Sequence, residues 1–287
     1  MQQKHFLGLS AAGFHRIAYT EWGDPADPRP VVCVHGLTRN GRDFDVLAAA
    51  LAARGRRVVC PDIVGRGRSD WAADPAVYGY PQYCADMGAL IARLGAEEVD
   101  WVGTSMGGLI GMFVAGARNT PVRRLVMNDI GPFIPKAFME RLRSYVGQPL
   151  RFPSLAALEA HLREIHAPFG PLTDAQWRHL AEHGAQALRS GGYVLACDPH
   201  IADAIRAGEA MDIDLWAAWA RVSVPVLVVR GARSDLLGLD IVARMRDTHP
   251  HRDVAELVVP EAGHAPALMA DDQVQAVADW LCGTGST

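Results

Sequence analysis

The chain has 287 residues, of which 49% are hydrophobic and 21% are charged, the balance of an ordinary globular protein. Its formal net charge of −4 gives no overall attraction to nucleic acid or to an anionic membrane, so neither is an expected partner. No apolar run approaches the roughly 20 residues of a membrane-spanning helix, and the start, MQQKHFLGLS, is too polar for a secretion signal, so we expect a cytoplasmic protein.

The predicted elements alternate along the chain. Segments 4–9 and 15–23 resemble an antiparallel pair of edge strands, and six apolar runs follow at 31–36, 57–63, 99–105, 124–132, 225–231 and 255–263. Their continuous Val and Leu content favours strands buried on both faces, as in a parallel sheet. Helical patterns occupy 44–55, 81–95, 106–119 and 274–283. This order predicts an α/β fold with helices on both faces of the sheet.

The alternation stops between residues 131 and 220. This stretch is rich in His and Arg, has helix-like patterns interrupted by APFGPLTD and RSGGY, and contains no strand-like run. We therefore predict a core made of residues 1–130 and 221–287, with residues 131–220 inserted as a helical cap.

A serine stands between glycines where a strand pattern gives way to a helix pattern, in VDWVGTSMGG. Ser105 forms the G-x-S-x-G pattern with Gly103 and Gly107. Glycines are required around a serine at the tip of so sharp a turn, because side chains there would collide. The next helix directs its N-terminal dipole toward the serine, where negative charge develops in acyl transfer. We predict that Ser105 is a nucleophile and not an incidental residue of a glycine-rich turn.

A serine nucleophile needs a base that is neutral near pH 7, which is usually histidine. His264 follows the last apolar run in VVPEAGHAPALM, so it would lie at the carboxyl edge of the sheet, where ligands bind. His249 and His251 precede that run and would lie at the opposite edge. We predict that His264 is the base, the alternative being a structural loop histidine.

The imidazole in turn needs a buried carboxylate that fixes its tautomer. Asp129 in VMNDIGP and Asp235 in VVRGARSDLLG both end strand-like runs, and either could reach the histidine. The order Ser, Asp, His favours Asp235, with Asp129 as the alternative acid. For the oxyanion, the backbone amides of Met106 and Leu37 are the predicted donors, the second because it follows His35-Gly36 directly.

Together these motifs resemble the α/β-hydrolase family with an inserted lid. The resemblance covers nearly the whole chain and includes PDIVGRGRSD at 61–70, whose residues from Asp62 to Asp70 would shape a loop beside the site. It implies a mostly parallel eight-stranded sheet and a cap after the sixth strand. The serine in the turn between strand and helix argues against dehalogenases and epoxide hydrolases, which resemble this family but carry aspartate at that position. The loop RGARSD, which contains Asp235, is one residue longer than the commoner GxxD spacing of this family. Asp129 therefore remains the alternative acid.

The predicted reaction is hydrolysis of a small-molecule carboxylic ester through an acyl-enzyme, without a cofactor. Hydrolysis of a carbon–carbon bond in a ring-cleavage product is the alternative reaction, and a binding protein with little turnover is the alternative class. Trp71, Phe133 and Phe138 are candidates for an apolar pocket. His179 and His183 stand four apart on a helix pattern but lack a third ligand motif, and the five cysteines show no CxxC, so no metal is expected. Oligomeric state is not predicted.

Overall fold

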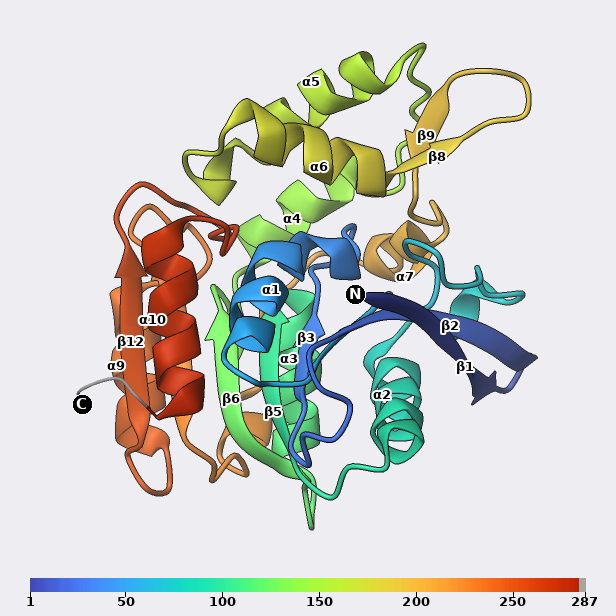
Figure 1. The fold of residues 1–287 in the computed structure, drawn as a ribbon. Helices are drawn as coiled ribbons and strands as arrows, with labels where there is room; N and C mark the ends of the chain where they lie inside the picture. The colour runs from blue at the N-terminus through green and yellow to red at the C-terminus, as the bar shows by residue number, and fades with distance from the viewer. Residues whose placement is uncertain (284–287) are drawn as a thin grey trace.

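The computed structural model describes residues 1–283 and has an eight-stranded sheet at its centre, in the order β1-β2-β4-β3-β5-β6-β11-β12 (Figure 1). The pair β1 and β2 is antiparallel, β2 is antiparallel to β4, and the remaining neighbours are parallel. The bounds are β1 (Gln2–Ser10), β2 (Gly13–Trp22), β3 (Val31–Val34), β4 (Val58–Pro61), β5 (Val99–Thr104), β6 (Val122–Asn128), β11 (Val226–Gly231) and β12 (Val254–Val259). The predicted fold class is confirmed.

Helices cover both faces of this sheet, which explains why β3, β4, β5 and β11 are buried along nearly their whole length. Successive residues of β3 point to opposite faces. Val32 and Val34 pack in the layer of α2 (Tyr80–Leu94), α3 (Met106–Ala115) and α9 (Leu239–Thr248). Val31 and Cys33 pack in the layer of α1 (Asp45–Ala53) and α10 (Asp271–Cys282).

The strand order places a crevice at the end of β3. Strand β4 lies on one side of β3 and β5 lies on the other. The helices that follow β3 and β5 pack on opposite faces of the sheet, which leaves a crevice between the two strand ends. Ligands bind outside the carboxyl ends of the strands at such a point. The loop 35–40 and the β5–α3 turn therefore meet where a site is expected.

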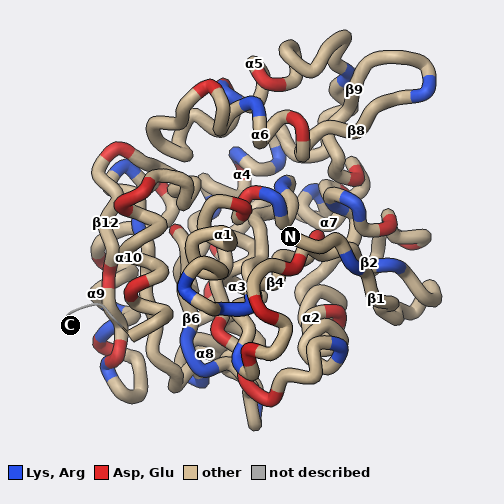
Figure 2. Tube along the Cα trace, viewed as in Figure 1, with Lys and Arg blue, Asp and Glu red and all other residues tan. Residues whose placement is uncertain are grey.

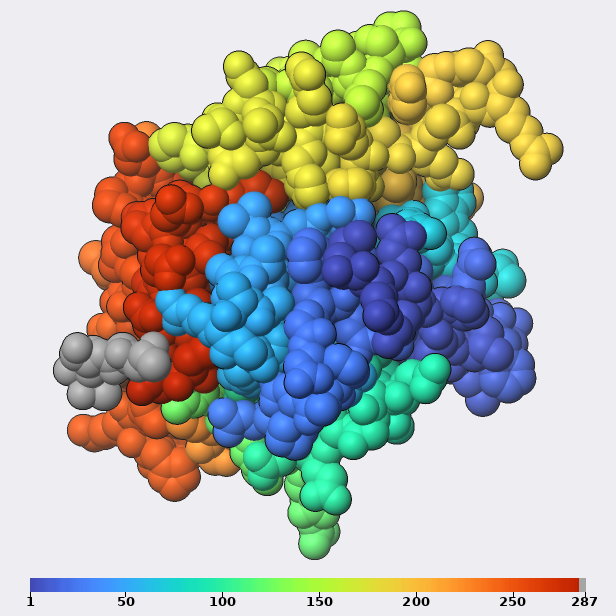
Figure 3. Space-filling view, viewed as in Figure 1, coloured from blue at the N-terminus to red at the C-terminus, as the bar shows by residue number. Residues whose placement is uncertain are grey.

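The segment 131–220, which we call the cap segment, lies above the carboxyl edge of the sheet (Figure 1). Its elements are β7 (Phe133–Ile134), α4 (Lys136–Tyr145), α5 (Leu155–Ile165), η3 (Ala167–Phe169), α6 (Asp174–Gly184), β8 (Ala185–Ala187), β9 (Tyr193–Leu195), α7 (Ile201–Arg206), β10 (Ile213–Asp214) and α8 (Trp216–Trp219). Two further short helices, η1 (Gly41–Phe44) and η2 (Pro75–Val77), lie outside it. In Figure 3 the yellow residues of the cap segment rest directly on the blue residues near η1.

The expectation of a purely helical cap is corrected by its short strands. Strand β8 pairs with β9 and β7 pairs with β10, both antiparallel. Strands of two or three residues are too short to produce a hydrophobic pattern. The division of the chain into a core and a cap remains our interpretation, and residues 284–287 of the predicted core lie outside the described part.

Charged side chains of both signs are interspersed over the surface, in keeping with the small net charge (Figure 2). Within residues 1–283, no helix has both the length and the apolar character needed to cross a bilayer.

Candidate active site

The turn from β5 into α3 is as sharp as the glycine pattern predicts. Ser105 adopts φ 51° and ψ −113°, a conformation that a residue with a side chain rarely takes. A Cβ atom on Gly103 would lie 2.2 Å from the Gly107 carbonyl oxygen, and one on Gly107 would lie 2.0 Å from that of Val34. Both glycines are therefore required for β5, α3 and β3 to pack this closely, and the serine side chain is left at the end of the strand.

Ser105 and His264 meet at this position, although 159 residues separate them in sequence. The distance from Ser105 Oγ to His264 Nε2 is 2.9 Å, and His264 Nδ1 lies 2.9 Å from Asp129 Oδ2. An ionised carboxylate can only accept, so Nδ1 carries the proton and Nε2 is free to accept from the serine hydroxyl. The arrangement can transfer a proton from Ser105 to His264 while Asp129 holds the ring in place.

The expectation that Asp235 orients the histidine is corrected, because Asp129 does so. Asp129 is fully buried and accepts hydrogen bonds from the Gly231 amide at 2.8 Å and the Ser234 hydroxyl at 2.6 Å, besides that from His264. Asp235 is exposed at the surface and pairs with Arg141. The loop after β11 thus supports the carboxylate that ends β6 and does not supply the acid itself.

Sequence reasoning missed Ser234 and Asn128, which brace this constellation. Asn128 is fully buried, and its side-chain amide donates to the Pro266 carbonyl at 2.8 Å and to Thr104 Oγ1 at 3.0 Å. It thereby ties the end of β6 to the end of β5 and to the loop that carries His264. The extra residue in RGARSD was the only sequence signal that pointed away from Asp235.

The loop after β3 is held rigidly beside Ser105. His35 Nδ1 donates to the Gly36 carbonyl at 2.7 Å, and His35 Nε2 accepts from the Ile63 amide at 2.9 Å. Both bonds suit a neutral ring, and burial lowers the pKa of His35 to about 3. The buried Arg66 guanidinium donates to the Leu37 carbonyl at 2.9 Å and to Tyr83 Oη at 3.0 Å.

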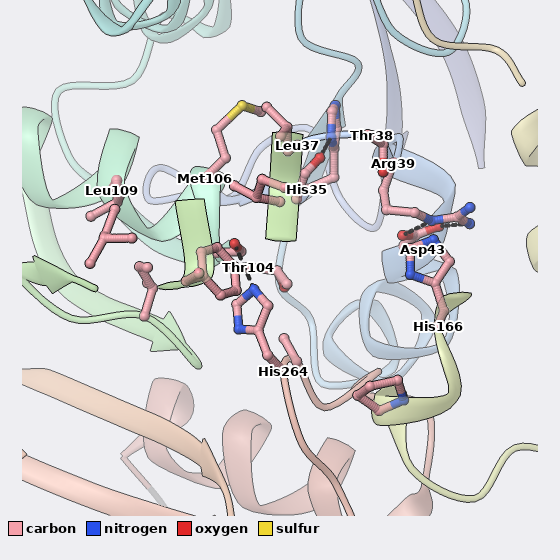
Figure 4. Close-up of a pocket in the computed structure, with 18 of the residues that line it drawn as sticks. His35, Leu37, Thr38, Arg39, Asp43, Thr104, Met106, Leu109, His166 and His264 are labelled. Atoms are coloured by element: carbon pink, nitrogen blue, oxygen red, sulfur yellow. Dashed lines mark hydrogen bonds and ion pairs between the residues drawn. The ribbon is translucent and has the colours of Figure 1, made fainter. Parts of the chain in front are cut away.

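Leu37 and Met106, whose backbone amides are the predicted oxyanion donors, lie in the loop after β3 and at the start of α3. Both residues line the pocket that contains Ser105 (Figure 4). Within residues 1–283, neither backbone amide donates a hydrogen bond. Their assignment as oxyanion donors stays a prediction that this geometry permits.

The pocket above Ser105 has a volume of about 870 Å³ and is enclosed by residues of the core and the cap segment. Phe138 lines it, and its ring meets the His264 ring edge-on with centroids 5.0 Å apart. Phe133 and Trp71, the other two predicted lining residues, do not. Phe133 lies in β7 paired with β10, and Trp71 is exposed beside Phe14 and Asp70 in a separate hollow.

The structure brings His179 and His183 together with a third possible metal ligand, Asp45, all within 4.8 Å. Arg42 occupies both carboxylate oxygens of Asp45 at 2.5–2.9 Å, and His179 Nε2 donates to the Arg42 carbonyl at 2.9 Å. These side chains are therefore engaged in joining α6 of the cap segment to η1 and α1.

Fold and site together have the form of a hydrolase of the α/β class, and comparison with known proteins agrees. The sequence model described as "alpha/beta hydrolase fold" matches residues 29–270. The chain therefore belongs to the α/β-hydrolase fold family, as its motifs predicted, and is an enzyme of that class.

Three relatives illustrate how far the similarity extends. A 3-hydroxybutyrate-oligomer hydrolase of Cupriavidus necator is 47% identical, and the alignment covers 96% of each chain. A 2-(acetamidomethylene)succinate hydrolase of Mesorhizobium japonicum is 31% identical over 80% of this chain and 79% of that one. The crystal structure of an α/β hydrolase from Novosphingobium aromaticivorans superposes with a TM-score of 0.83 at 34% identity, covering 98% and 97% of the two chains.

Proposed function

We propose that this protein is a serine esterase that hydrolyses short oligomers of 3-hydroxybutyrate through an acyl-enzyme. The observation that carries the reaction type is the hydrogen-bonded chain from Asp129 through His264 to Ser105 at the floor of a pocket. The substrate class is taken from the 47% identical relative, whose alignment spans nearly all of both chains.

In the first half of the reaction, Ser105 Oγ attacks the ester carbonyl carbon while His264 Nε2 accepts the hydroxyl proton. Asp129 stabilises the resulting imidazolium through Nδ1–H. The Leu37 and Met106 amides receive the oxyanion, and a single donor of this kind is typically worth about 10²–10³ in rate. His264 then protonates the departing alcohol oxygen, and the acyl group remains on Ser105.

In the second half, His264 removes a proton from water, which attacks the acyl carbonyl. The same two amides hold the second oxyanion, and the proton returns from His264 to Ser105 Oγ as the acid leaves. One cycle on a hydroxyacid oligomer gives two shorter products. One carries the new carboxylate, and the other carries the new hydroxyl.

The direct test measures release of 3-hydroxybutyrate from its dimer and trimer by chromatography. We expect turnover by the wild type and a loss of about 10³-fold or more in Ser105→Ala, since the nucleophile is removed. Ser144→Ala, which changes an exposed serine of α4, should retain wild-type activity. Equal activity in wild type and Ser105→Ala would refute the proposal.

The two alternatives give different results in the same samples. A carbon–carbon hydrolase would bleach a yellow dienol-keto acid, whereas we expect no bleaching. A binding protein would be labelled by a fluorophosphonate at Ser105 yet leave p-nitrophenyl acetate intact, whereas we expect both labelling and hydrolysis.

A further inference from the structure

The pocket around Ser105 has two chemically different sides. One is mainly apolar and is built by the cap segment and α3, with Leu109, Ile134, Phe138, Ile205 and Leu215 among its lining residues and Arg141 over the Phe138 ring. The other carries Arg39, Asp43 and His166. Figure 4 shows these three polar residues on one side of His264, and Leu109 and Met106 on the other. Internal units of a hydroxyacid oligomer carry only ester oxygens, whereas its ends carry a free hydroxyl or a carboxylate, so a polar side that can both donate and accept hydrogen bonds suits a chain end.

His166 lines the polar side, and its ring is free to bind a substrate. It follows α5, and its ring stacks on Phe169 with centroids 4.4 Å apart. Neither ring nitrogen has a hydrogen-bond partner within residues 1–283. Burial, together with the nearby Arg39, lowers the pKa of His166 well below its usual range, so the ring is neutral at pH 7. The ring is partly buried and lines the pocket, so its nitrogens are available to a ligand that enters the pocket.

The charges beside His166 are already balanced. Arg39 is buried and donates from Nε and Nη2 to the two carboxylate oxygens of Asp43, at 2.9 and 2.7 Å, and Nη2 also reaches the Leu180 carbonyl. A bound carboxylate would meet Asp43 as a like charge, with the Arg39 charge already compensated. A neutral imidazole has one donor and one acceptor, and a hydroxyl group offers the same pair. The polar side therefore suits a neutral hydroxyl better than a carboxylate.

The position of the polar side bears on which half of the ester would carry the hydroxyl that it binds. Arg39 lies two residues after Leu37, whose amide is the proposed holder of the acyl carbonyl oxygen. On the apolar side, Phe138 contacts the His264 ring, which delivers the proton to the leaving alcohol. A substrate whose acyl unit reaches His166 would lie with that unit toward the polar residues and with its leaving chain toward the apolar ones.

We propose that His166 binds the free hydroxyl of a terminal 3-hydroxyacyl unit, so that the enzyme shortens its substrate from the hydroxyl end. This assignment rests on the proposed esterase function. His166 is then a specificity-determining residue, and the apolar side accommodates the rest of the chain.

The test compares p-nitrophenyl 3-hydroxybutyrate with p-nitrophenyl butyrate, which differ only in the hydroxyl group. The wild type should prefer the hydroxylated ester by about tenfold in kcat/KM, the effect of one hydrogen bond made to a desolvated group. In His166→Phe the two values should agree within about twofold, with the butyrate value changed by less than about threefold. His166→Gln, whose amide also donates and accepts, should recover part of the preference.

His161→Phe provides the matched control. His161 lies in α5, one turn before His166, packs against Phe152 with the two rings tilted, and is not among the residues that line the pocket. This variant should keep the wild-type preference. A preference that survives in His166→Phe, or that is lost equally in His161→Phe, would overturn the assignment, as would a parallel loss of both substrates in His166→Phe.

The direction of cleavage is tested on end-blocked dimers. Acetylation of the terminal hydroxyl should slow wild-type hydrolysis by about tenfold, while methylation of the terminal carboxylate should change it by less than about threefold. The reverse result would overturn recognition of the hydroxyl end. If neither nitrophenyl ester is hydrolysed faster by the wild type than by Ser105→Ala, the proposed function itself fails, which is a distinguishable outcome.

Discussion

At the residue scale, the chemistry depends on how firmly Asp129 is held. Its backbone has φ 53° at the end of β6, and its carboxylate receives hydrogen bonds from the Gly231 amide, the Ser234 hydroxyl and the His264 ring. Hydrogen bonds to an ionised group are stronger than those between neutral groups. Two of these three donors, Gly231 and Ser234, come from the end of β11 and the loop that follows it. This segment holds the carboxylate in place, and the carboxylate in turn orients the imidazole.

Exchanging the two candidate carboxylates for amides separates their roles. In Asp129→Asn the neutral amide cannot hold His264 in the required tautomer, and we expect kcat to fall by about 10³–10⁴. Asp235→Asn removes an exposed ion pair with Arg141, which lines the pocket, but leaves the hydrogen bonds among Ser105, His264 and Asp129 intact, so its kcat should change by less than about tenfold. Steady-state kinetics with p-nitrophenyl acetate measure both. Similar losses in the two variants would contradict the assignment of Asp129.

The sequence predicted that Ser105 and His264 meet, and it favoured Asp235 over Asp129, whereas Asp129 is the carboxylate that contacts the histidine. Gly103, Gly107 and Gly263 mark turns at strand ends, and strand ends of a parallel sheet converge. Asp129 and Asp235 both satisfy that rule, and which of them points inward is decided by tertiary contacts. The Leu37 and Met106 amides have no side-chain signature and remain predictions.

At the element scale, the loops that follow β3 and β4 lock one another. The Ile63 amide donates to His35 Nε2, and Asp62 accepts from the Gly41 and Arg68 amides at 2.7 and 2.9 Å. Ser69 Oγ donates to the Asp62 carbonyl at 2.5 Å. These bonds explain why the segment 61–70 is rich in glycine and polar residues although none of its side chains is assigned to the chemistry.

This lock should make stability depend on pH through His35. Its pKa is about 3 in the folded protein and about 6.5 when unfolded, so between these values only the unfolded chain binds the proton. The contribution of His35 to the free energy of unfolding is therefore full above pH 6.5 and declines as the pH falls toward 3. Urea unfolding of wild type and His35→Gln should show a stability gap that narrows by about 1 kcal/mol from pH 7.5 to 5.5. A constant gap would contradict a neutral His35.

Most elements with a strong periodic pattern were predictable, and short ones were not. Every long strand of the sheet lies within or beside a predicted run, and α1, α2, α3 and α10 overlap predicted helices. The ten-residue α9 was missed, although its amphipathic pattern is as strong as those of α2 and α10. Strands β7 to β10 have two or three residues each and exist only through their pairing partners.

At the scale of the whole molecule, the cap segment is fastened to the loop after β4 and to η1. Tyr78 Oη donates to Asp198 Oδ2 at 2.5 Å and accepts from the Ala72 amide at 2.8 Å. Backbone hydrogen bonds join Gly67 to Ala196 and Asp198 to Gly65. Through these contacts the cap segment closes the pocket over Ser105, so its attachment is expected to matter for stability and for access.

Removing the Tyr78 hydroxyl tests this attachment. Tyr78→Phe leaves the buried Asp198 carboxylate without one donor, so we expect the free energy of unfolding to fall by about 1–3 kcal/mol. Tyr193→Phe removes a hydroxyl that has no partner within residues 1–283 and should change stability by less than about 0.5 kcal/mol. Chemical denaturation measures both, and an undiminished stability in Tyr78→Phe would show that this contact does not hold the cap segment.

The proposed mechanism passes through a covalent intermediate on one side chain. Rapid quenching of the wild type with a 3-hydroxybutyrate trimer, followed by peptide mass spectrometry, should find a hydroxybutyryl group on the peptide that contains Ser105 and on no peptide of Ser105→Ala. Turnover of the trimer with an adduct at another residue, or with none under conditions that trap acyl-enzymes, would contradict nucleophilic attack by Ser105.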